Sequence, residues 1–82
     1  MEENSVIELV NDEKYLVLDK IILEDIRYLF CIKLNSDESV GNKNKFFKYK
    51  KENNDYFVVE ETDINIITKL KKIIKNLSVN NF

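Results

Sequence analysis

The chain has 82 residues, of which 44% are hydrophobic and 34% are charged, and its formal net charge is −2. This length excludes two ordinary domains, and the apolar and aromatic content excludes a disordered polar tail. We therefore expect a single domain spanning residues 1–82, in which nearly every apolar element must be buried because so small a core is only marginally stable.

The first half of the chain predicts β-strands. Ser5–Val10 predicts a short strand, followed by a polar turn. Between Tyr15 and Leu34, two apolar runs flank Glu24-Asp25-Ile26, a pattern typical of a hairpin. Apolar residues alternate from Tyr28 to Leu34, which is the period of a strand. Asp19-Lys20 interrupts the alternation of the earlier run and predicts a bulge or bend.

A second hairpin is predicted after a polar loop. Asn35–Asn44 has no apolar period and contains the only glycine, Gly41, so we expect a loop there. Lys45–Lys50 and Tyr56–Glu60 then flank the polar segment Glu52–Asp55. The expected sheet is an antiparallel meander of four or five strands.

From Asp63 to Leu77 the apolar period changes to that of an amphipathic helix. Thr62 or Asp63 is expected to cap its N-terminus, and the residues after Leu77 are expected to fray. The fold class is therefore α+β, with the sheet followed by one C-terminal helix. The predicted apolar stripe of this helix comprises Ile66, Ile67, Leu70, Ile73, Ile74 and Leu77.

The order of these elements resembles that of a known protein family. Val17-Leu18-Asp19, the turn at Glu24-Asp25, Tyr28-Leu29-Phe30 and the run Asp55–Glu61 ahead of the terminal helix resemble the YrzB-like family of small uncharacterised Firmicute proteins. The resemblance covers about Ile7 to Ile74 and rests on pattern rather than on a chemical motif. It implies a fold and no activity.

The residues that most enzymes require are missing. The chain has no histidine, which removes the usual general base at neutral pH and the commonest transition-metal ligand. The lone Cys31 sits at a strand position, where a small buried side chain is expected rather than a nucleophile. Neighbouring acids such as Glu24-Asp25, Asp37-Glu38 and Glu60-Glu61 fall on turns or strand ends and fit no calcium-binding loop. One glycine cannot build a phosphate-binding loop. We expect no catalytic residue, metal or cofactor.

Sequence features also predict a location. A single cysteine excludes an intrachain disulfide, and the first residues are acidic and polar, unlike a secretion signal. The longest apolar runs fall short of the ~20 residues that span a bilayer. We expect a cytoplasmic protein without a membrane segment.

A basic and aromatic stretch supports two alternatives. It could bind single-stranded nucleic acid, with lysines on phosphates and aromatic rings on bases. It could instead be an edge strand with Phe47 and Tyr49 facing inwards and lysines guarding the edge, and we favour this interpretation. The stretch comprises Lys43, Lys45, Phe46, Phe47, Lys48, Tyr49, Lys50 and Lys51.

The sheet is expected to have apolar side chains on both faces, and this predicts a partner. One helix covers one face of a sheet, yet the opposite face is expected to carry Leu29, Cys31 and the aromatics Phe46 and Tyr56. A second copy of the chain, another protein or the folded N-terminal segment must cover this face, because large exposed apolar areas usually mark interaction sites. Charge is also divided: residues 1–41 hold ten acids and four bases, and residues 42–82 hold five acids and nine bases.

The leading hypothesis is a non-enzymatic module that binds a macromolecular partner, most simply a protein. Its expected partner-binding residues are Lys45, Phe46, Lys48, Lys50 and Tyr56. Two alternatives stay open: a phage-encoded inhibitor of a host enzyme or defence nuclease, similar in role to anti-CRISPR proteins, and a single-stranded nucleic-acid binder that uses Lys43–Lys51. A homodimer is a further open possibility.

Overall fold

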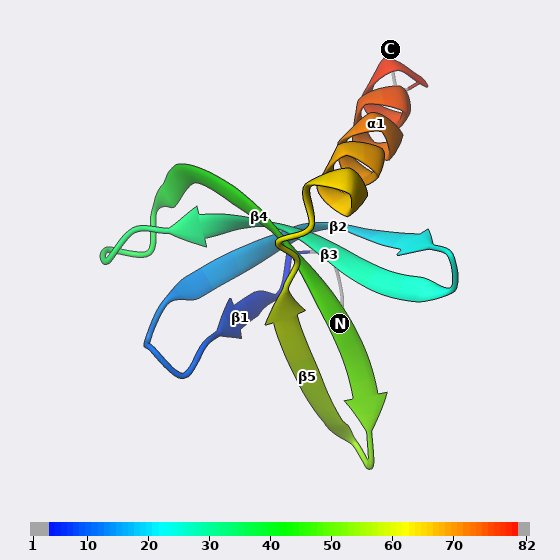
Figure 1. The fold of residues 1–82 in the computed structure, drawn as a ribbon. Helices are drawn as coiled ribbons and strands as arrows, with labels where there is room; N and C mark the ends of the chain where they lie inside the picture. Colours follow the sequence, from blue (N-terminus) through cyan, green and yellow to red (C-terminus); the bar gives the residue numbers. More distant parts are fainter. Residues whose placement is uncertain (1–3, 81–82) are drawn as a thin grey trace.

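A computed structural model describes the backbone of residues 4–80 and the side chains of residues 4–75. It contains a five-stranded antiparallel meander, in which the strands neighbour one another in chain order, followed by one helix (Figure 1). The predicted α+β fold is confirmed. The elements are β1 (Val6–Glu8), β2 (Lys14–Leu23), β3 (Ile26–Leu34), β4 (Val40–Glu52), β5 (Asp55–Glu60) and α1 (Ile64–Asn80).

Both predicted hairpins are present and turn within two residues. Glu24 and Asp25 join β2 to β3 with φ of 52° and 65°, and Asn53 and Asn54 join β4 to β5 with φ of 48° and 73°. Positive φ at both central residues is typical of the type I′ turn, whose twist matches that of the flanking strands. Here the turn is formed without glycine.

A bulge in β2 exchanges the two faces of the strand. Val17 pairs with Cys31 and Asp19 pairs with Phe30, which leaves Leu18 as an extra residue. Because side chains alternate between faces, the extra residue moves the following odd-numbered residues to the opposite face. Tyr15 therefore lies in one core and Ile21 in another. The bulge predicted at Asp19-Lys20 is confirmed, one residue earlier in the chain.

The first core lies on the face away from α1. Leu29 and Cys31 were expected on this face beneath some cover, and both are fully buried within the chain itself. In Figure 1 the strands cross near the centre and the hairpins point outwards in different directions, as in a strongly coiled sheet. The N-terminal segment contributes to the cover through Ile7 and Leu9. The cluster comprises Ile7, Tyr15, Val17, Leu29, Cys31 and Phe47, with Leu9, Tyr49 and Val58 packed against it.

The second core lies beneath α1. Leu70 is fully buried against Ile21, Tyr28 and Phe46, and it is accompanied by the partly buried Ile66, Ile67, Ile73 and Ile74. This confirms the predicted apolar stripe, except that Leu77 lies outside the described side chains. The helix continues through Asn80, so the prediction of a frayed tail from Ser78 is wrong for residues 78–80; residues 81–82 lie outside the described chain.

The start of α1 is capped as expected. Asp63 Oδ1 accepts a hydrogen bond from the backbone N–H of Asn65 at 2.9 Å, and the Asp63 carbonyl accepts one from Ile67 N–H at 2.9 Å. Asp63 is therefore the capping residue, which satisfies a backbone donor that the first helical turn leaves unpaired.

The predicted loop over Asn35–Asn44 is too long, because β4 already begins at Val40. A Cβ on Gly41 would lie 2.6 Å from the backbone oxygen of Lys33, so glycine permits a close approach between β4 and β3 rather than a loop. In addition, β4 pairs with both β3 and β5. The expectation that Lys45–Lys50 forms an edge strand is therefore wrong.

Cys31 should be unreactive in the folded protein. Burial raises the pKa of its thiol from an ordinary 9.0 to about 12, so the nucleophilic thiolate is scarcely populated near neutral pH. At pH 8 we expect a disulfide reagent to label Cys31 only as fast as the protein unfolds, with labelling accelerated by urea. The pKa of the thiol is higher in the folded protein than in the unfolded chain, so protonation of Cys31 favours folding. The share of the free energy of unfolding that comes from this difference is complete below pH 9 and declines as the pH rises towards 12. Labelling of the native protein at the rate of a free thiol would contradict this assignment.

Candidate interaction surface

A groove lies on the same face of the sheet as α1, beyond the strand positions that the helix covers. Its volume is about 700 Å³. We call it the β4–β5 groove. It is lined by Asp25, Ile26, Arg27, Lys48, Tyr49, Lys50, Lys51, Phe57 and Val59.

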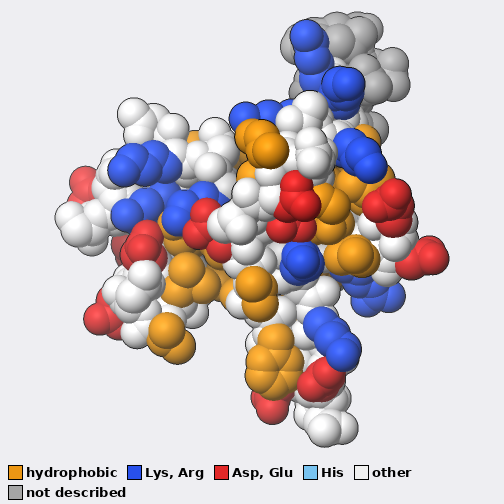
Figure 2. Space-filling model, viewed as in Figure 1, with side chains coloured by type: hydrophobic (Ala, Val, Ile, Leu, Met, Phe, Trp, Pro, Cys, Tyr) orange, Lys and Arg blue, Asp and Glu red, His pale blue; other side chains and the backbone are white. Residues whose placement is uncertain are grey.

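The strand register places apolar side chains in this groove. Lys48 pairs with both Tyr28 and Val59, so Val59 lies on the same face as the buried Tyr28. Phe57 is on this face too, because it is two residues away. The exposed fractions are 54% for Phe57, 64% for Val59 and 41% for Ile26. In Figure 2 hydrophobic side chains lie at the surface over β5, with Lys or Arg side chains beside them.

Basic groups surround these apolar side chains. Lys50 Nζ lies 2.7 Å from Glu52 Oε1, and Lys48 Nζ lies 3.6 Å from Glu61 Oε1. Arg27 and Lys51 form no ion pair with any described residue; the Lys51 ammonium instead lies 5.6 Å from the centroid of the Tyr56 ring. The cations on the apolar face of the groove are therefore paired with glutamates. Arg27 and Lys51, which the register places on the other face, supply the positive charge that remains at its border, and this suits a partner that is both apolar and acidic.

A buried carboxylate borders the groove. Glu61 is only 7% exposed, and its Oε1 accepts a hydrogen bond from Tyr28 Oη at 3.4 Å as well as the ion pair with Lys48. Its Oε2 accepts a bond from the backbone N–H of Asp63 at 3.3 Å. Glu61 thereby ties β3 and β4 to the start of α1, and it holds Lys48 at the boundary between the helix and the groove.

The structure separates the five predicted partner-binding residues. Phe46 is 4% exposed and its ring lies 5.0 Å from that of Phe30, centroid to centroid, so the prediction that it is a surface anchor is wrong. The reason is the register, which sets Phe46 opposite Phe30 beneath α1. Lys48 and Lys50 both line the groove. Lys45 and Tyr56 lie on the opposite face of the sheet.

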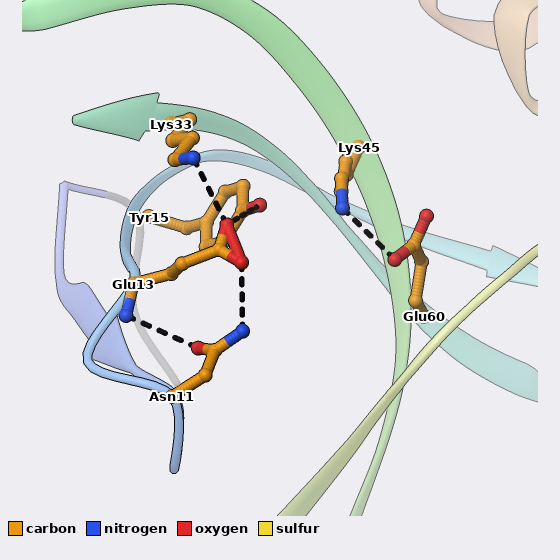
Figure 3. Close-up of polar contacts among 6 residues, drawn as sticks. All are labelled: Asn11, Glu13, Tyr15, Lys33, Lys45 and Glu60. Carbon is orange, nitrogen blue, oxygen red and sulfur yellow. Dashed lines mark hydrogen bonds and ion pairs between the residues drawn. The ribbon is translucent and has the colours of Figure 1, made fainter. Parts of the chain in front are cut away.

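On that opposite face, Lys45 is already paired with a carboxylate (Figure 3). Lys45 Nζ lies 3.0 Å from Glu60 Oε1 and 5.7 Å from the centroid of the Tyr15 ring, and the Glu60 carboxylate raises the pKa of Lys45. Tyr56 is 43% exposed, and its ring centroid lies 6.4 Å from that of Tyr49. These contacts stabilise the fold and leave Lys45 little freedom to bind a partner.

The other group in Figure 3 centres on Glu13, at the turn before β2. Its carboxylate accepts hydrogen bonds from Asn11 Nδ2 at 2.7 Å and Tyr15 Oη at 3.0 Å, and it lies 3.1 Å from Lys33 Nζ. The bond from Lys33 is the main cause that lowers the pKa of Glu13. The cluster joins the turn to β2 and β3, and we assign it a structural role.

The sequence pattern did not single out Ile26, Phe57 or Val59 as site residues. One signal was present: residues 56–59 are Tyr-Phe-Val-Val, so both faces of this strand carry apolar side chains. Val58 packs against the first core, which leaves Phe57 and Val59 on the other face. The position of the site also depends on how much of the sheet α1 covers, and a sequence pattern does not predict this.

Comparison with family models, with curated proteins and with solved structures found no match. The resemblance to the YrzB-like family therefore stays a prediction. Within the described part of the chain, no three His, Cys, Asp or Glu side chains gather where they could hold a metal ion. The same residues include no helix with the length and apolar character needed to cross a membrane.

Replacing Glu61 should cost far more stability than replacing its neighbour Glu60. Glu61→Ala removes the acceptor for Tyr28 Oη and leaves Lys48 without its carboxylate, so we expect the free energy of unfolding to fall by about 1–3 kcal/mol. Glu60→Ala removes an exposed ion pair with Lys45, for which we expect a loss below about 1 kcal/mol. Urea unfolding of both variants measures the difference; equal losses would contradict the structural role assigned to Glu61.

Proposed function

We propose that this chain is a non-enzymatic interaction module that binds a protein partner through the β4–β5 groove. One observation carries the proposal: Ile26, Phe57 and Val59 lie exposed in one groove, although the chain buries apolar side chains on both faces of its sheet. Burial of such side chains against a partner is favourable by about 25 cal/mol per Å². Apolar patches bordered by charge are typical of interaction sites.

The chemistry of the groove agrees with binding rather than catalysis. Its titratable side chains are one aspartate, one tyrosine, three lysines and one arginine, and the chain has no histidine to act as a base. The only thiol, that of Cys31, is buried in the first core with a raised pKa. These features support a module that acts through contact with another molecule.

The nucleic-acid alternative has less support. The lysines of Lys43–Lys51 are divided between two faces of the sheet, and Lys45, Lys48 and Lys50 each lie beside a glutamate. A platform for unstacked bases needs several aromatic rings beside free cations on one face. An inhibitor of a host enzyme or nuclease is one form of protein binding, so that alternative stays a prediction, as does the cytoplasmic location.

Two matched valine variants test the proposal. Val59 in the groove is 64% exposed, and Val40, at the far end of β4, is 59% exposed. Each is replaced by threonine, which keeps the shape and β-branching but adds a hydroxyl. The immobilised wild-type chain and both variants are incubated with nuclease-treated extract of the source cell. We expect retention of the specific partner to fall about fivefold with Val59→Thr and to stay unchanged with Val40→Thr.

A stronger variant, Phe57→Ser, should reduce retention by about tenfold or more, because aromatic anchors dominate interface energies. Quantitative mass spectrometry of the retained proteins gives the measurement. The proposal is wrong if no retained protein distinguishes Val59→Thr and Phe57→Ser from Val40→Thr, or if retention disappears after nuclease treatment.

A further inference from the structure

The outer edge of β5 is unpaired in the described chain. The sheet ends at β5, which pairs with β4 alone. Glu61 N–H donates to the carbonyl of Phe46 at 2.8 Å, and positions bonded to the neighbouring strand recur at every second residue of an antiparallel pair. The backbone groups of Phe57 and Val59 therefore face β4. Those of Tyr56 and Val58 point outwards, along the free edge.

This edge lacks the usual protection against strand pairing. Natural edge strands carry lysine, proline or a bulge that prevents another strand from adding. The sequence of β5, Asp-Tyr-Phe-Val-Val-Glu, contains no lysine or proline, and its register with β4 is unbroken. Its groove-facing side chains, Phe57 and Val59, are more than half exposed. The edge can therefore accept an extended segment by ordinary strand pairing.

The charge around the edge selects the kind of segment. Arg27, Lys48, Lys50 and Lys51 line the groove together with one acid, Asp25. Because Glu61 and Glu52 pair with Lys48 and Lys50, the charge available to a partner is that of Arg27 and Lys51. A strand added to β5 would place alternate side chains beside Phe57 and Val59, with the lysines of β4 one strand further in. A second copy of the chain would bring its own lysines together with the two acids of its β5, Asp55 and Glu60, and so gains little from these cations. A segment with acids at the alternate positions beside Tyr56 meets the Lys51 ammonium instead.

We propose that the partner contributes a sixth strand to the sheet: an extended, acidic segment with apolar residues at alternate positions, paired with the outer edge of β5 and covering Phe57 and Val59. This inference rests on the proposed function, because it names the partner for the same groove. Main-chain hydrogen bonds to Tyr56 and Val58 supply part of the affinity, and the groove supplies the specificity.

A displayed library of random peptides of about ten residues tests the proposal, since this is long enough to form one strand. The full chain is the target. We expect the enriched peptides to be rich in Asp and Glu, to carry apolar residues at alternate positions and to lack internal proline. Enrichment of basic peptides, or of peptides without these features, would overturn the proposed chemistry.

Val58→Pro tests the strand pairing directly. Proline has no N–H, and the Val58 N–H points away from β4, so the variant loses an outward donor while the β4–β5 pairing is kept. We expect the selected peptides to bind at least about tenfold more weakly. Circular dichroism confirms that the variant is folded. Undiminished binding to the folded variant would overturn strand addition.

Two charge variants on β4 give a test that does not depend on the proline variant. Lys51→Glu reverses an unpaired charge beside Tyr56, and Lys43→Glu makes the same change at an exposed position outside the groove. We expect Lys51→Glu to weaken peptide binding about tenfold and to reduce its dependence on salt, and Lys43→Glu to change affinity by less than about twofold. Equal effects of the two variants would overturn the role of charge.

The outcomes separate the two proposals. Peptides that lose affinity with Phe57→Ser but not with Val58→Pro would overturn strand addition and leave the groove as a binding site. Failure to enrich any peptide sensitive to either variant would overturn both proposals. Analytical ultracentrifugation tests whether a second copy of the chain occupies the edge of β5 instead. Self-association that Val58→Pro abolishes would show this and would contradict an acidic partner segment.

Discussion

The extra residue in β2, Leu18, is the constraint on which the rest of the structure depends. A chain of 82 residues has too little apolar surface to leave one face of its sheet bare. Without the bulge, Ile21 would lie on the same face as Tyr15 and Val17, and the core beneath α1 would lose this side chain. With it, one strand contributes to both cores.

The division into two cores also explains where the groove lies. Coiling of the sheet brings Ile7 and Val58 over the first core, so that face needs no helix. The single helix is then free to cover the other face, but it reaches only Ile21, Tyr28, Phe46 and their neighbours. The part of this face formed by the ends of β3, β4 and β5 stays open. Glu61, buried at this boundary, joins the covered part to the open part.

Local patterns in the sequence predicted most of the fold. Alternation predicted the strands, Glu24-Asp25 and the segment around Asn53-Asn54 marked the hairpins, and the spacing of Ile66 to Ile74 marked the helix. The predictions were wrong where the pairing of one strand with another determines the structure. Residues 40–44 are polar and become a strand only through their contact with β3, and the face on which Phe46 lies depends on its register with Phe30. The groove combines residues from three strands, so only its lysines were visible as a cluster.

The turns at Glu24-Asp25 and Asn53-Asn54 have a consequence for the proposed recognition of a partner. In each turn both residues lie in the left-handed region, where side chains restrict the backbone far more than glycine would. Ile26 directly follows one turn, and Phe57 lies shortly after the other, so two opposite sides of the groove are anchored by stiff connections. The free and bound backbones should therefore differ little. Docking would then lose little conformational entropy, and affinity would report mainly the fit of the incoming segment.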